Sequence, residues 1–152
     1  MNFNNFTIKS QEAVQEAVNL VQSRGQQAIE PAHILHGVMK VGENVTNFIF
    51  QKLGMNGQQI ALVLDKQTDS LPKVSGGEPY LSRETNEVFQ KATQYSKEMG
   101  DEFVSLEHLL LALLTVKSTV STILKDAGMT ERELRNAITE LRKGEKVTSQ
   151  SS

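Results

Sequence analysis

The 152-residue chain contains no cysteine, no tryptophan and only three prolines. The absence of cysteine excludes disulfides, thiolate zinc sites and cysteine nucleophiles. The net charge of -2 lacks the basic excess that nucleic-acid binding requires. The longest apolar run, residues 109–114, is too short to cross a bilayer. We therefore expect neither nucleic acid nor membrane as a partner, and the N-terminus, which does not resemble a signal peptide, predicts a cytoplasmic location.

Catalytic motifs are also missing from the sequence. There is no Gly-x-Ser-x-Gly turn and no glycine-rich phosphate-binding loop followed by Lys and Ser or Thr. His33 and His36 are spaced closely enough to share a metal ion, but no cysteine completes the set and His33 has a repeated counterpart, His108. A structural role for these histidines is the better interpretation. The sequence predicts no catalytic residue, no metal site and no cofactor in this chain.

What the chain does contain is an internal repeat with an offset of 75 residues. A one-residue deletion changes the offset to 74, which aligns Gly54-Met55 with Gly128-Met129. Self-similarity at a fixed period indicates two copies of one supersecondary unit. The identical pairs are Glu12/Glu87, Gln15/Gln90, Ala17/Ala92, Gly25/Gly100, His33/His108, Leu35/Leu110, Val41/Val116 and Val45/Val120.

The apolar periodicity is helical almost throughout, and no stretch sustains the alternation of a strand. Capping residues and glycines give the expected limits of eight helices. The first is expected to run from Thr7 to Arg24, the second from Pro31 to Lys40, and the fifth from Ser82 to Met99. The remaining helices are expected to open at Asn44, Asn56, Ser105, Ser118 and Thr130.

Short helices cannot bury their apolar faces alone, so the two halves should pack together. The predicted fold class is all-α: an eight-helix bundle made of two four-helix repeats related by a pseudo-twofold axis. The domain is expected to span residues 1–147, with repeats at about 6–67 and 80–143 and a Pro-, Gly- and Ser-containing connector at 68–79. The composition of residues 144–152 is typical of the start of a flexible linker.

The segment 101–108, with its counterpart 26–33, is the strongest candidate for a functional site. Ile29 and Val104 are expected to fill the core between helices, because branched aliphatic residues are usually buried. Asp101 and Glu107 have two interpretations. They are either ordinary polar residues of a loop or the rim of a binding cleft.

At these residues the sequence resembles the Clp N-terminal domain, which fronts hexameric AAA+ unfoldases. The combination of Ile-Glu-Pro, Leu-Pro and Leu-Arg-Lys-Gly-Glu resembles the branch of ClpB-type disaggregase chaperones. The first copy of the repeat carries Ala32 where the ClpC-like branch has a glutamate, which argues against symmetric phosphoarginine recognition. The matching stretches include Phe6-Thr7-x-Lys9, Ile29-Glu30-Pro31-x-His33-Ile34-Leu35, Gly100-Asp101-x-Phe103-Val104-Ser105 and Ile123-Leu124-Lys125-x-Ala127-Gly128.

The resemblance implies a domain that binds exposed apolar segments of unfolded or aggregated polypeptides and passes them to a hexameric ATPase ring. ATP and magnesium would belong to the parent protein, and the isolated domain is expected to be monomeric. By position in the family, the substrate-binding residues would be Thr7, Asp101 and Glu107, with Phe89 and Tyr95 in an apolar groove near the fifth helix. The alternatives are an adaptor-docking domain of a ClpC/ClpA-type unfoldase, a domain that only gates the ring, and a stand-alone enzyme.

Overall fold

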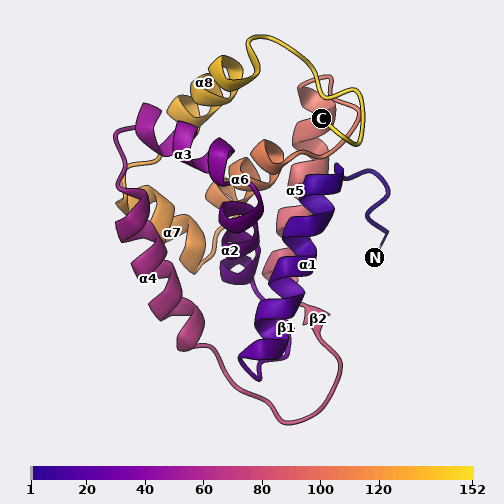
Figure 1. Cartoon of the computed structure of the whole chain (residues 1–152), viewed down its shortest axis with the longest axis vertical. Coiled ribbons are helices and arrows are strands. Elements are labelled where there is room, and N and C mark those ends of the chain that lie inside the picture. The colour runs from indigo at the N-terminus through magenta and orange to yellow at the C-terminus, as the bar shows by residue number, and fades with distance from the viewer. Residues whose placement is uncertain (1) are drawn as a thin grey trace.

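The computed structural model describes residues 2–152 and contains, within that range, eight helices and two short strands (Figure 1). The all-α prediction is confirmed. The elements are α1 (Ile8–Ser23), β1 (Ala28–Ile29), α2 (Pro31–Val41), α3 (Glu43–Lys52), α4 (Gly57–Asp69), β2 (Tyr80–Leu81), α5 (Arg83–Glu98), α6 (Leu106–Thr115), α7 (Thr119–Asp126) and α8 (Glu131–Arg142).

The helix starts follow the chemistry of their N-cap residues. A Ser, Thr or Asn side chain precedes five of the helices and accepts a hydrogen bond from a backbone amide of the first turn, which would otherwise lack a partner. α3 begins two residues earlier than a cap at Asn44 would give, because Gly42 precedes it. The five side-chain caps are Thr7, Asn56, Ser82, Ser118 and Thr130.

Two parallel backbone bridges join the repeats, and the sequence patterns gave no sign of them. β1 pairs with β2, with Ile29 opposite Leu81. A second, isolated bridge pairs Phe6 with Val104. The offset of 75 maps Phe6 onto Leu81 and Ile29 onto Val104, so the two bridges are equivalent. In each repeat, the segment before the first helix therefore pairs with the segment before the second helix of the other repeat.

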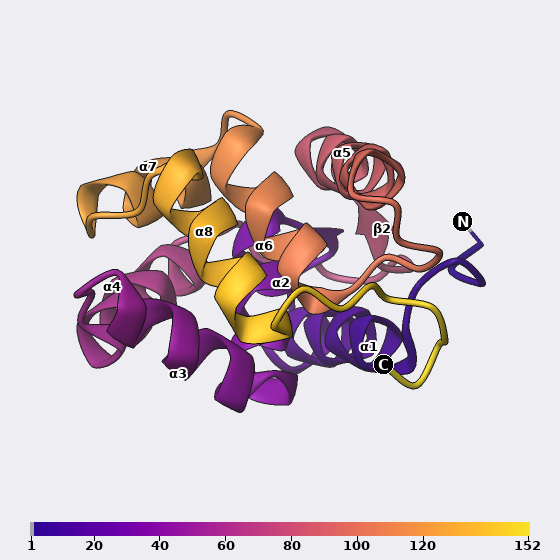
Figure 2. The ribbon, with the colours of Figure 1, turned by 90° about the horizontal axis from the view of Figure 1, so that it is seen from above.

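The helices show the same reciprocity. α2 and α6 lie at the centre and contact each other, while α1 packs on α2 and α5 packs on α6 (Figures 1 and 2). α3 contacts α8 and, in the equivalent relation, α4 contacts α7. This exchange of partners is what a pseudo-twofold arrangement of two four-helix units requires.

The core lies along α6, where every residue from Leu106 to Leu114 is buried. Ile29 and Val104 are 4% and 0% exposed, as expected for residues that fill the space between helices. Within residues 2–152 no single helix is long and apolar enough to span a membrane. The α6–α7 pair reaches that length and composition together, but is bent by 96°.

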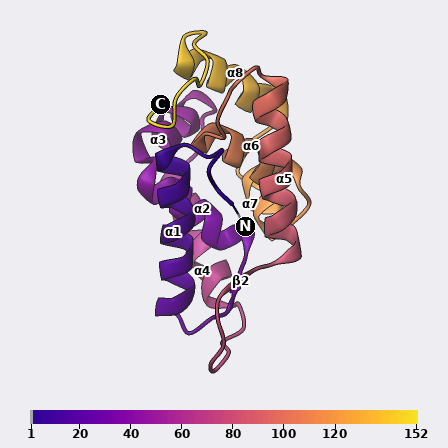
Figure 3. The same ribbon diagram turned by 90° about the vertical axis from the view of Figure 1, so that its right-hand side faces the viewer.

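Residues 144–152, whose composition is typical of a linker, lie against the domain after α8. Lys143 adopts a left-handed conformation with φ of 52°, and the chain then turns back towards the first residues of α1 (Figure 3). Val147 is buried, and the backbone amide of Ile8 donates to the carbonyl of Gln150 at 2.7 Å. Composition alone missed this docking because the segment has a single apolar anchor.

The crossing of α1 over α2 predicts that Gly37→Ala destabilises the domain. A β-carbon at Gly37 would lie 2.1 Å from the carbonyl oxygen of Ala13, a backbone atom that cannot swing aside. Alanine gains about 1 kcal/mol of helix propensity over glycine, but overpacking typically costs about 1–3 kcal/mol and should dominate here. Urea denaturation should therefore show a net loss of stability. Gln15→Ala, on the exposed face of α1, is the control, and an equally stable Gly37→Ala variant would contradict the packing.

Candidate functional site: a pocket between the repeats

A pocket of about 390 Å³ opens where the start of α1 meets the start of α6 and the end of α8. Thr7 comes from the first repeat, whereas Glu107 and Arg142 come from the second. Val45 and Leu141 give the pocket apolar surface. The pocket therefore combines contributions from both repeats with a polar end and an apolar side.

Arg142 is the central residue of the polar end. Its Nη1 donates to Oδ2 of Asp101 at 2.7 Å, and its Nε and Nη2 donate to Oε2 of Glu107 at 3.1 and 3.0 Å. The Oγ of Ser105 donates to the same Glu107 oxygen at 2.8 Å. Two carboxylates thus share one guanidinium, which leaves one negative charge in excess when both are ionised.

His108 lies behind this cluster with a fixed tautomer. Its Nδ1 accepts the backbone amide of Ser105 at 2.8 Å, so the ring proton resides on Nε2, which donates to Oδ2 of Asp101 at 2.7 Å. Burial lowers the pKa of His108, and the Arg142 charge lowers it further, against the opposing effect of Asp101. The imidazole is therefore neutral and acts as a scaffold that orients Asp101.

The pKa of Asp101 lies below its ordinary value. Burial on its own would raise it, but hydrogen bonds from the Val147 amide and Arg142 outweigh burial, helped by the guanidinium charge and by His108. Asp101 is therefore an ionised carboxylate whose lone pairs are already engaged. A buried anion of this kind is stable only while its donors remain in place.

The structure brings together the three polar residues that the family resemblance had singled out. Thr7 and Glu107 line the pocket, and Asp101 is joined to Glu107 through Arg142. However, Thr7, Asp101 and Glu107 are only 1%, 7% and 9% exposed. Asp101 and Glu107 are nearly buried because both carboxylates are bound by Arg142. The sequence placed Arg142 in the last turn of a predicted helix and in the Leu-Arg-Lys-Gly-Glu motif, but did not indicate that it pairs with these acids.

The two aromatic residues expected in a groove are also buried. Phe89 is covered by Phe3 and Phe6, whose ring centroids lie 5.5 and 5.6 Å from its own. Tyr95 is 4% exposed and its hydroxyl lies 2.7 Å from Oγ1 of Thr115. Neither side chain presents open apolar surface. The i, i+3, i+4 pattern of α5 identified its buried face, and burial is what that pattern most often means.

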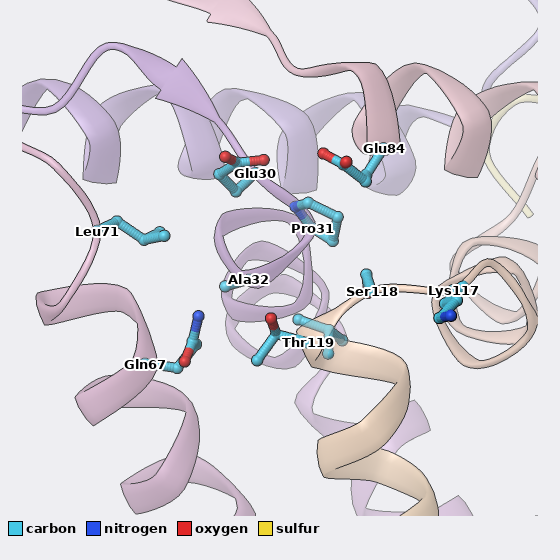
Figure 4. Close-up of a pocket in the computed structure, with 10 residues that line it drawn as sticks. Glu30, Pro31, Ala32, Gln67, Leu71, Glu84, Lys117, Ser118 and Thr119 are labelled. Atoms are coloured by element: carbon cyan, nitrogen blue, oxygen red, sulfur yellow. The ribbon is translucent and has the colours of Figure 1, made fainter.

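A second pocket, of about 260 Å³, is the counterpart of the first under the repeat offset (Figure 4). Here Glu30 and Ala32 stand in the places of Ser105 and Glu107, and Glu84 stands in the place of Lys9. Figure 4 shows the carboxylates of Glu30 and Glu84 on the same side of Pro31. The loss of the Glu107 counterpart at Ala32 makes the two pockets chemically different.

The first repeat supports its loop with neutral groups instead of the ionic cluster. His33 Nδ1 accepts from the amide of Glu30 at 2.9 Å, and its Nε2 donates to Oε1 of Gln26 at 2.7 Å. Gln26 in turn donates to the carbonyl of Thr68, the counterpart of Arg142. Within residues 2–152 no cluster of three or more His, Asp or Glu side chains has the geometry to hold a metal ion. His33 and His108 are thus equivalent parts of the fold.

A helical domain built from two such units, with a pocket at their junction, defines the class of protein. Residues 5–127 match the family described as the Clp repeat (R) N-terminal domain, and the chain belongs to that family. It is 94% identical over all 152 residues to the chaperone protein ClpB of Bacteroides thetaiotaomicron, and 58% identical to that of Porphyromonas gingivalis. The chain spans 18% of the length of each of these curated relatives.

Among solved structures, the N-terminal domain of Hsp104 from Candida albicans has the same fold. The TM-score is 0.85 at 20% sequence identity, and the match covers 97% of each chain. The resemblance to the Clp N-terminal domain, and to its ClpB branch, is confirmed.

The ionic cluster predicts that Arg142→Ala destabilises the domain strongly. The substitution leaves Asp101 and Glu107 buried without their cation, and breaking one side of a buried pair typically costs about 3–5 kcal/mol. Arg132→Ala, at an exposed position of the same helix, should cost well under 1 kcal/mol by the usual behaviour of surface sites. Chemical denaturation at neutral pH would measure both. Equal losses in the two variants would show that the cluster contributes nothing.

The buried histidine of the first repeat predicts a dependence of stability on pH. Burial, together with smaller contributions from the charges of His36 and Arg24, lowers the pKa of His33 to about 4. Below the ordinary histidine pKa of about 6.5 the unfolded chain binds a proton that the folded chain refuses, so stability falls as the pH drops towards 4. The free energy of unfolding should decrease less over this window in His33→Gln than in the wild type. A wild-type stability that stays constant from pH 7 to 4.5 would contradict the assignment.

Proposed function

We propose that this chain is the client-recognition domain of a ClpB-type ATP-dependent disaggregase. It binds exposed apolar segments of unfolded or aggregated polypeptides and hands them to an ATPase ring. The observation that carries the proposal is the pocket between the repeats, in a chain that is 94% identical to the N-terminal region of a ClpB chaperone. The hexameric ring, its ATP and magnesium, and the cytoplasmic location belong to the proposed whole protein.

The pocket has the chemistry that such binding requires. Val45, Leu106 and Leu141 offer apolar surface next to the polar Thr7 and Glu107. An apolar surface of this kind selects side chains that a native protein hides, with little demand on sequence. Because ordering an unfolded segment offsets much of the contact energy, affinity per domain should be weak. Weak binding suits a client that has to leave for the ring, and several tethered copies would raise the effective concentration.

The charge of the site favours segments that carry Lys or Arg beside apolar residues. Within the buried cluster Asp101 and Glu107 outnumber Arg142 by one negative charge, while two lysines and one further glutamate also line the pocket. Complementary charge mainly speeds encounter and adds selectivity. An incoming guanidinium would compete with Arg142 for Glu107, the more exposed of the two carboxylates.

In this proposal the aromatic residues of α5, Phe89 and Tyr95, are not the primary contacts of the client. Phe89 becomes available to a client only when Phe3, which is half-buried above it, moves aside. Tyr95 serves to hold α5 in place through its contact with Thr115, so its replacement would weaken the fold before it weakens binding. The proposed client contacts therefore centre on the pocket at Thr7 and Glu107.

The proposal predicts that Val45→Ser weakens binding of a permanently unfolded protein. Val45 is partly exposed in the pocket, and removing a few tens of Å² of apolar contact should cost about 1 kcal/mol, or about fivefold in affinity. Val63→Ser is the matched control, because Val63 is exposed on α4 away from the pocket. Fluorescence anisotropy with a labelled client would give both affinities. Equal effects of the two substitutions would contradict the pocket as the binding site.

The same experiment separates the proposal from adaptor docking. A client-recognition domain binds unfolded chains and ignores their native forms, since the apolar segments are then hidden. A docking domain of the ClpC/ClpA type would form a fixed complex with one native protein and would be indifferent to unfolded chains. Titrating the domain with a reduced, unfolded protein and with its native form distinguishes the two.

A further inference from the structure

The segment Lys146–Gln150 crosses the edge of the pocket without helical structure as far as Thr148 and then turns at 149–150. Its contacts come from three separate parts of the domain: the end of α5, the loop before α6 and the start of α1. Each of these parts offers a backbone group or a carboxylate that no helix uses. The segment is thus bound to the domain in the manner of a short peptide.

The backbone contacts of Val147 resemble those of an added strand. Its amide donates to Oδ1 of Asp101 at 3.0 Å, and its carbonyl accepts from the amide of Glu102 at 2.8 Å. Further along, the carbonyl of Gln150 accepts the amide of Ile8 at 2.7 Å. Ile8 is the first residue of α1, so its amide has no acceptor within the helix. These contacts recognise an extended backbone and do not depend on sequence.

Three side chains add selectivity, and one of them is Gln150, whose Nε2 donates to the carbonyl of Asn4 at 2.7 Å. Val147 is 6% exposed and is the single apolar anchor of the segment. The Nζ of Lys146 donates to the carbonyl of Met99, the C-cap of α5, at 2.7 Å. A cation at the carboxyl end of a helix is favoured both by the free carbonyls and by the helix dipole. Thr148 and Ser149, in contrast, are exposed.

The join between this segment and α8 allows it to detach without disturbing the helix. Lys143 and Gly144 both have positive φ, at 52° and 81°, and Gly144 has open space around its α-carbon. One buried aliphatic side chain and a few hydrogen bonds give a contact of low stability. Detachment removes the Val147 amide from Asp101, whose remaining donors, Arg142 and His108, lie outside the segment.

We propose that the surface beneath residues 146–150 is a peptide-binding track and that the chain's own C-terminal segment is its resident occupant. An extended client segment with a basic residue followed by a branched aliphatic residue takes the same place when the resident detaches. This inference rests on the proposed function, because it identifies the kind of client segment and a competitor for it within the chain. Whether the client can occupy the track depends on its affinity relative to that of the resident segment.

The test uses two charge-matched variants of the whole chain, Val147→Asp and Thr148→Asp. An aspartate at position 147 removes the apolar anchor and places a second carboxylate beside Asp101, so the segment should detach. The same substitution at the exposed position 148 should leave it bound. The probe is a labelled peptide with the sequence of residues 145–152, and a second peptide with aspartate in place of its valine is the specificity control.

The Val147→Asp domain should bind the probe about tenfold more tightly than the wild type or Thr148→Asp, because a tethered competitor has been removed. The control peptide should not bind. Equal affinity of all three proteins for the probe, or equal binding of both peptides, would overturn the track.

If Val147→Asp does not unfold cooperatively, Val147→Ser replaces it, and the same order of affinities is expected. The amide of Glu102 should also exchange with solvent faster in the detached variant.

A permanently unfolded client separates this inference from the proposed function. If the client binds every variant with one affinity, the domain recognises clients elsewhere and the track is wrong. If the client binds none of them while the probe still prefers Val147→Asp, the track stands and client recognition fails. Tighter binding of the client to Val147→Asp than to Thr148→Asp supports both.

Discussion

The exchange of backbone hydrogen bonds between the repeats fixes the position of everything else in the domain. The segment before α1 pairs with the segment before α6, and the segment before α5 pairs with the segment before α2. In each case the bridge leads directly into an N-cap, Thr7 or Ser82. The carbonyl of Ile29 accepts both the amide of Ser82 and the hydroxyl of Thr85, which ties the cap to the bridge. The starts of helices from different repeats are thereby held side by side, and pockets form between them.

The two junctions share one frame but differ in charge. One loop is supported by neutral partners, Gln26 and His33, while the other is supported by Asp101, His108 and Arg142. Every buried side-chain nitrogen and oxygen in residues 2–152 has a hydrogen-bond partner, so neither junction leaves a buried polar side-chain atom unpaired. The ionic version costs more desolvation, which a well-packed neutral network avoids. The ionic cluster of the second repeat lies at the larger of the two pockets, next to the docked segment that follows α8.

Much of the fold could be predicted from the sequence, because helix periodicity and capping are local properties. Thr7, Ser82 and Thr130 were identified as caps from residue type and spacing alone. The parallel bridges could not be found in this way, since two-residue strands have no periodicity and their partners lie far apart in the chain. The equivalence of His33 and His108 followed from the repeat, but their opposite electrostatic settings depended on Gln26 and Asp101.

The candidate site was predicted less well, for a physical reason. A sequence shows that Asp101 and Glu107 are acidic, but not that an arginine 35 residues after Glu107 forms ion pairs with both. Likewise, an apolar face on α5 identifies Phe89 and Tyr95 as buried or binding without saying which. Val147 fell where the expected domain, 1–147, and the expected linker, 144–152, overlap, and an isolated valine among polar residues has no pattern that predicts its burial. Long-range pairing, rather than local propensity, decides these positions.

The central claim is that an unfolded chain binds at the junction of Thr7 and Glu107. The most direct measurement is an NMR titration of the isotope-labelled domain with a permanently unfolded, unlabelled protein. We predict shift changes at the amides of Thr7, Ile8, Glu102 and Glu107, and none at Val63 on α4. Changes confined to α4 and α7, with the junction unaffected by saturating client, would contradict it.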